Sequence, residues 1–149
     1  MDAREWLASV MQAARTARYE QRWADLQRER ALGFSQSLMP RVHSGASDPM
    51  RAIDALVDGE RDHADRLSCA LAELAEASRV FQGMRSIGLM EREAADVMEL
   101  YSIHLLTLPD IARGLAISVS TAERRKRFGL DWLDANGFAH AKASTGTAT

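Results

Sequence analysis

The clearest chemistry in the sequence comes from hydroxyl and basic side chains that share one short stretch near the C-terminal end. These residues are Ser118, Ser120, Thr121, Arg124, Arg125, Lys126 and Arg127. On a helix, Arg124 and Arg127 follow one another by one turn, and we expect them to point outward together with Ser120 and Thr121. Hydroxyl and guanidinium groups donate hydrogen bonds to phosphate oxygens and to base edges. The pattern is therefore typical of a helix that contacts double-stranded DNA.

The residues before this stretch predict a short helix and a tight turn that would position it. Pro109 and Asp110 suit the first turn of a helix, where a missing N–H is tolerated and a carboxylate meets the positive end of the helix dipole. Residues 114–117 then supply a turn, and Ser118 can cap the helix that follows. The inward face of that second helix is expected to consist of Ala122, Gly129, Leu130 and Leu133. Residues 108–133 therefore predict a helix-turn-helix, whose second helix would enter the major groove.

The charge distribution has a simpler explanation, which must be weighed against DNA contact. A basic run alone more often marks a solvated helix surface than a binding site. The net charge of −2 gives no sign of a nucleic-acid partner, but residues 48–76 carry eight acids against three arginines, whereas residues 118–130 carry four bases and one acid. The ordered set of short helix, turn, capping serine and basic second helix favours DNA contact over a plain charged surface.

The composition predicts an all-α fold. Alanine, leucine, arginine and glutamate recur throughout, prolines and glycines are few, and no run of alternating β-branched residues indicates a strand. The single cysteine, Cys69, excludes an internal disulfide and suits the reducing cytoplasm of a bacterial host. We expect no membrane span and no signal peptide, because no apolar stretch is long enough and the first residues lack the required pattern.

Nothing in the sequence predicts catalysis, a metal or a cofactor. The four histidines are scattered, and Cys69 has no partner at the spacing of metal ligands. The sequence also lacks a glycine-rich phosphate loop and the pattern of a nucleophilic triad. We therefore expect a protein that is not an enzyme.

Two long helices are expected before the helix-turn-helix, over residues 2–33 and 48–86. The second helix carries a residue every seven positions on one seam: Ile53, Glu60, Leu67, Leu74 and Phe81. Such a seam needs a partner helix to bury it. The partner is either the first helix, folded back as an antiparallel coiled-coil-like hairpin, or a second copy of the chain. Glu60 interrupts the apolar seam, and it either pairs with an arginine of the first helix or lies in water.

These elements divide the chain into three predicted parts. A helical hairpin occupies residues 1–87, and a three-helix unit that contains the helix-turn-helix occupies residues 88–137. The stretch at 34–48 contains four serines, one proline and one glycine, and it predicts a linker. Residues 138–149 lack periodicity and predict a disordered tail.

The segment DIARGLAISVSTAERRKRFGLDWL resembles sigma-70 region 4, in the order Ile-Ala, Leu, Ile-Ser, Thr-Ala, basic residues and a closing Leu. Together with the upstream helices, residues 4–133 resemble small phage-encoded transcriptional regulators of the ArpU and RinA type. The resemblance implies control of a phage operon, such as a late or packaging operon. The sequence departs from the pattern at Ala116, where a turn glycine is usual, and at Arg125 and Lys126, where an apolar residue often packs.

We therefore expect a sequence-specific transcriptional regulator, encoded by a phage or prophage, that binds double-stranded DNA. RNA polymerase and a second copy of the chain are further candidate partners. One alternative is a helical structural or protein-interaction module, whose long heptad helix is the functional surface. Another is a DNA-packaging protein like the small subunit of a phage terminase, which also joins a helix-turn-helix to a coiled coil but usually places the DNA-binding part first.

Overall fold

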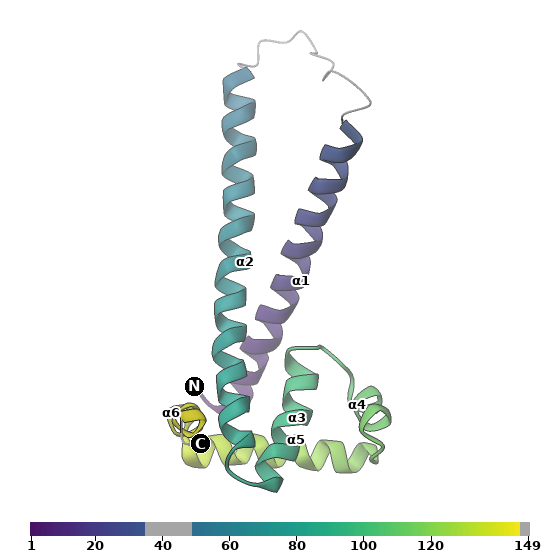
Figure 1. Cartoon of the computed structure of the whole chain (residues 1–149), viewed down its shortest axis with the longest axis vertical. Coiled ribbons are helices and arrows are strands. Elements are labelled where there is room, and N and C mark those ends of the chain that lie inside the picture. The colour runs from purple at the N-terminus through teal and green to yellow at the C-terminus, as the bar shows by residue number, and fades with distance from the viewer. Residues whose placement is uncertain (35–48, 147–149) are drawn as a thin grey trace.

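The protein is all-α, as the composition predicts. The computed structural model describes residues 1–34 and 49–146, and these residues form helices joined by short connections (Figure 1). The elements are α1 (Ala3–Phe34), α2 (Pro49–Arg85), α3 (Leu89–Ser102), α4 (Leu108–Leu115), α5 (Val119–Asn136), α6 (Phe138–Ala143) and a 3-10 helix (Ser144–Gly146). Apart from its first residue, the predicted linker at 34–48 lies outside the described residues. None of the described helices has both the length and the apolar character required to cross a membrane.

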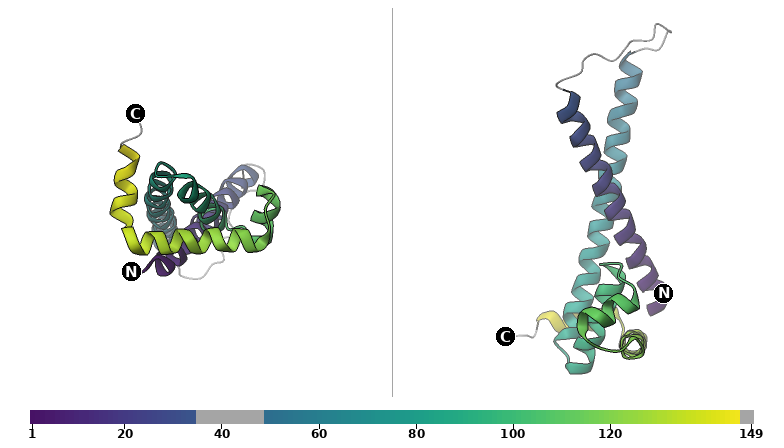
Figure 2. Two further views of the ribbon diagram at one scale, coloured as in Figure 1. Left: turned by 90° about the horizontal axis from the view of Figure 1, so that it is seen from below. Right: turned by 90° about the vertical axis from the view of Figure 1, so that its right-hand side faces the viewer.

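The helices α1 and α2 form an antiparallel hairpin. The two helices are packed together at one end, which we call the closed end. They lie side by side near the N-terminus of α1 and diverge toward the other end (Figures 1 and 2). Of the predicted seam on α2, Phe81 is buried, but Leu67 and Leu74 are only half-buried. The other buried residues on this side of α2 include Ala70, Ala77 and Met84. The facing side of α1 is rich in alanines, whose short side chains cannot fully cover a leucine.

The buried charge of the hairpin is Glu20 on α1, rather than Glu60 on the seam. Glu20 is only 3% exposed, and its carboxylate pairs with His63 Nδ1 and, at 3.5 Å, with Arg66 Nη1. The ring of Trp23 stacks on His63 with centroids 3.8 Å apart. A buried carboxylate needs such partners, because desolvation otherwise disfavours its charge. Glu60 is exposed, in agreement with the second of its two predicted environments.

A single hydrophobic core joins the hairpin to the C-terminal helices, across the predicted boundary at 87/88. Phe81 and Met84 of α2, Met98 of α3 and Leu133 of α5 all belong to it, and all are almost completely buried. Trp6 of α1 packs edge-on against Phe81, with ring centroids 5.5 Å apart. The closed end of the hairpin therefore shares its core with the predicted helix-turn-helix unit.

An ion-pair clamp fixes the turn between α2 and α3. Arg85, the last residue of α2, donates from Nε to Asp96 Oδ1 at 2.8 Å and from Nη2 to Glu99 Oε2. Burial disfavours the charged form of Arg85, but the hydrogen bonds with Glu99 and Asp96 outweigh it and raise the pKa of the guanidinium. The side chain thus stays charged while it holds α3 against the end of α2.

The prediction of a disordered tail at 138–149 is wrong for residues 138–146. Here α6 and the 3-10 helix pack against α2, with Ala141 completely buried. The packing is close because Gly83 leaves room for it: a Cβ atom at Gly83 would overlap the carbonyl group of Ala141. Short alanine side chains and this glycine allow two helices to approach without a long apolar period in the sequence, which is why periodicity missed the contact.

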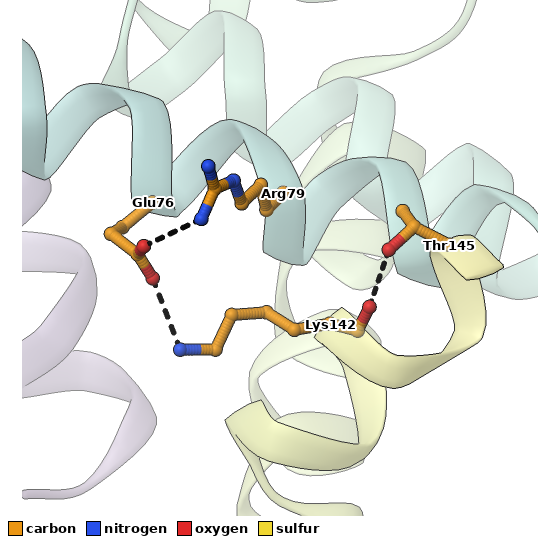
Figure 3. Close-up of polar contacts among 4 residues, drawn as sticks. All are labelled: Glu76, Arg79, Lys142 and Thr145. Carbon is orange, nitrogen blue, oxygen red and sulfur yellow. Dashed lines mark hydrogen bonds and ion pairs between the residues drawn. The ribbon is translucent and has the colours of Figure 1, made fainter.

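Polar contacts at the edge of α6 hold it in the same place (Figure 3). Lys142 Nζ donates to Glu76 Oε2 at 3.1 Å, Arg79 Nη1 donates to the other oxygen of Glu76 at 3.0 Å, and Thr145 donates to the Lys142 carbonyl. The hydrogen bond with Lys142 is the largest of the effects that lower the pKa of Glu76. Glu76 is at the surface, so these contacts select the position of α6 more than they add to stability.

We predict opposite stability changes for alanine at two glycines of α2. Gly83→Ala should destabilise the protein by about 1–3 kcal/mol, because the new methyl group displaces backbone atoms of α6. Gly59→Ala is the matched control: nothing lies within 4 Å of the added Cβ, and alanine is favoured over glycine inside a helix by about 1 kcal/mol. Urea unfolding of both variants measures the difference. Equal stability of the Gly83 variant and the parent would show that α6 is not docked on α2.

Candidate nucleic-acid interface

The candidate interface is built from α4, a tight turn and α5. Thr107 caps α4, since its Oγ1 accepts a hydrogen bond from the Asp110 N–H at 3.3 Å. After α4 ends, Ala116 takes the left-handed conformation, with φ 55° and ψ 44°. The Ser118 hydroxyl then accepts a hydrogen bond from the Thr121 N–H at 3.1 Å and caps α5, as the sequence predicts. The turn that joins α4 to α5 therefore takes only three residues, 116–118.

The inner face of α5 matches the prediction. Ala122, Gly129, Leu130 and Leu133 are all buried. Gly129 allows the closest approach, because a Cβ atom there would overlap the side chain of Met98 on α3. This packing fixes the rotation of α5 about its own axis, and it thereby decides which side chains face solvent.

Four of the predicted site residues lie on the solvent side of α5. Ser118, Ser120, Arg124 and Arg127 are exposed, whereas Thr121 is half-buried. Helix α5 runs across the closed end of the hairpin, with α4 beside its first turns (Figure 2). Arg124 makes no ion pair with any described residue, and Arg127 remains 64% exposed although it lies 3.6 Å from Glu123. These two guanidinium groups are accessible to a ligand.

The other two basic residues of the cluster face α3 instead. Arg125 Nη2 lies 3.4 Å from Glu93 Oε2, and Lys126 Nζ lies 4.3 Å from the centre of the Tyr101 ring. Successive residues of a helix point about 100° apart, so four in a row cannot share one face. The structure thus separates the predicted cluster into two accessible arginines and two cations that cover α3, where their stems take the place of an apolar residue.

Two further exposed residues, outside the predicted set of site residues, lie on α4 and at the start of α5. Val119 is exposed between Ser118 and Ser120 at the start of α5, and Arg113 is exposed on α4, where its Nη1 lies 3.7 Å from Asp110 Oδ1. The position of Val119 in the first turn after a capping serine is a signal that would have identified it. No such signal in the sequence identifies Arg113, because the position of Arg113 relative to α5 depends on the angle between α4 and α5.

Acidic side chains limit the basic surface to the N-terminal half of α5. Asp131 and Asp134 are exposed on the C-terminal half. Asp134 is engaged within the protein, because its Oδ1 accepts a hydrogen bond from the Ala3 N–H at 2.8 Å at the start of α1. A polyanion would therefore meet favourable charge near Ser118–Arg127 and repulsion beyond it.

Neither a metal site nor a known relative provides a further guide to function. The described residues contain no group of three or more histidine, cysteine, aspartate or glutamate side chains that could hold a metal ion. No protein-family model matches the chain, and no curated protein or solved structure matches it either. The assignment of function therefore rests on the geometry of α4 and α5.

Ala116 provides a test of the turn geometry. The left-handed conformation strains a residue that has a Cβ, and glycine adopts it without that strain. After allowance for the greater freedom of glycine in the unfolded chain, Ala116→Gly should stabilise the protein by about 0.5–1 kcal/mol. Chemical denaturation measures this change, and a destabilised variant would contradict the conformation of the turn.

Proposed function

We propose that the protein binds double-stranded DNA through α4 and α5 and regulates transcription. One observation carries this proposal: the capped start of α5 leaves Ser118, Val119 and Ser120 exposed, and Arg124, which makes no ion pair with any described residue, is exposed one turn after Ser120. Small side chains at the start of a helix let its end approach the floor of the major groove. A long side chain one turn later can then reach a base edge or a phosphate.

The exposed groups match the two kinds of contact that sequence-specific DNA binding needs. Ser118 and Ser120 can donate to or accept from base edges, Val119 can contact a thymine methyl group, and Arg124 can donate two hydrogen bonds to guanine. Arg113 and Arg127 flank these residues and suit phosphate contacts, which position a protein on the duplex. The positive end of the α5 dipole also favours a phosphate there.

The regulatory role extends this proposal. Transcriptional control of a phage or prophage operon, with RNA polymerase as a candidate partner, is supported by the resemblance of residues 4–133 to small phage-encoded regulators and of residues 110–133 to sigma-70 region 4. A DNA-packaging role would use the same α4–α5 surface. The interaction-module alternative is favoured by a different observation, the exposed apolar side chains Leu56, Val57 and Leu71 on α2.

We predict that Arg124→Ala/Arg127→Ala weakens binding to a pool of random-sequence duplexes without loss of stability. Both side chains are exposed, so their removal leaves no cavity. Each lost phosphate contact should lower the slope of log affinity against log salt by about one. The double variant should therefore lose about one to two, according to whether Arg124 contacts a base edge or a phosphate. Fluorescence anisotropy of a labelled duplex pool over a salt series measures both affinity and slope, and selection of bound sequences from the pool tests specificity.

Arg28→Ala/Arg61→Ala is the matched control, because it removes the same charge from exposed positions of the hairpin. It should bind the duplex pool with nearly the parental salt slope. If the parent does not bind DNA at low salt, the proposal is wrong. If both double variants lose affinity equally, binding follows net charge alone and α5 is not the contact surface.

A further inference from the structure

An apolar ridge on α1 is left largely exposed by the other described residues. Tyr19 and Leu26 are 64% and 51% exposed, and Trp23 is half-buried between them. Their spacing of four and three residues places all three on one side of the helix. With Arg18 and Arg22 they line a shallow pocket on the outer surface of α1.

The ridge lies on the same face of the hairpin as an acidic stretch of α2. On that face a groove is lined by Thr16 of α1 and by Arg66 and Cys69 of α2. Tyr19 follows Thr16 by one turn, and Asp62 precedes Arg66 by one turn, so both continue this face toward the diverging end of the hairpin.

The charges along the ridge and along the acidic stretch are opposite in sign. Arg15, Arg22 and Arg30 lie beside the ridge at helical spacing, whereas Asp62 and Asp65 are exposed on α2. None of these five side chains forms an ion pair with another described residue. Within one copy the arginines and the aspartates belong to different helices that diverge toward this end (Figure 1).

Gly59 is a second, independent observation on the same face. It lies inside α2, two turns before Arg66, and nothing is found within 4 Å of where its Cβ would be. A glycine inside a helix costs about 1 kcal/mol relative to alanine. No contact with another described residue accounts for it, whereas a helix that packs across this position would need the space.

We propose that this face binds a second copy of the chain. A twofold axis parallel to the hairpin places α1 of each copy against α2 of the other, because the rotation exchanges the two sides of the face. The Tyr19–Trp23–Leu26 ridge then lies over Gly59 of the other copy, and Arg22 lies near the other copy's Asp62. Both α4–α5 surfaces are carried at the same end of the dimer.

The size of the face sets the expected strength of association. About 16 residues of each helix extend about 24 Å, and two helices side by side are about 20 Å wide, which gives about 500 Å² per copy. The total of about 1,000 Å² is at the lower end for a specific interface, so we expect a dimer that forms reversibly as the protein concentration rises. Opposite charges at the rim should make it weaker in high salt.

Sedimentation velocity of the full chain without DNA, over a range of concentrations, tests this proposal. The parent should shift from monomer to dimer as concentration rises. Leu26→Asp should weaken the dimer at least tenfold, whereas Leu89→Asp, at an exposed residue of α3, should leave it unchanged. Gly59→Gln should raise the melting temperature, since glutamine is the better helix former, and yet weaken the dimer. A fall in both quantities would contradict the docking position.

A charge exchange tests the pairing itself. Arg22→Asp and Asp62→Arg should each weaken the dimer, and the double variant should recover most of the parental affinity. A parent that stays monomeric at all concentrations overturns the proposal. So does a dimer that survives Leu26→Asp or that is lost with Leu89→Asp. These outcomes leave the proposed DNA contact untouched, because none of the substitutions lies on α4 or α5.

Discussion

Phe81 and Met84 are buried at the point where the hairpin meets the C-terminal helices, and the rest of the structure depends on this packing. The same core holds Met98 of α3 and Leu133 of α5. Because interiors are closely packed, α5 cannot rotate or slide without opening this core. The surface presented by Ser118–Arg127 is therefore fixed relative to α1 and α2. A fragment that lacks the hairpin would expose the apolar side of α3 and α5, so the two parts are not expected to fold separately.

The fixed rotation of α5 explains why four adjacent cations have different roles. Arg125 and Lys126 pair with groups of α3 and help to hold α5 in place, whereas Arg124 and Arg127 remain in solvent. The same rigid core also fixes the position of the proposed DNA contact relative to the proposed dimer face. A dimer formed along the hairpins would carry two α5 helices in a constant arrangement, and two linked binding surfaces gain affinity through effective concentration.

Local signals in the sequence predicted much of this structure. The capping serine at 118, the inner face of α5 and the bounds of the long helices follow from hydrogen-bonding and periodicity that act over one or two turns. Contacts between helices distant in sequence were not predictable in this way. The docking of α6 depends on Gly83, and the burial of Glu20 depends on His63, which reaches it only because the two long helices cross at that level.

Amide chemical shifts of the isotopically labelled full chain, recorded while a DNA duplex is added, test the central claim most directly. We predict that the largest changes occur at Ser118–Arg124 and at Arg113, because these backbone groups lie at the proposed contact. Residues 54–66 of α2 should change little, since acidic side chains line that part of the helix. Changes concentrated on α1 or α2, or no changes at low salt, would contradict α4 and α5 as the DNA-binding surface.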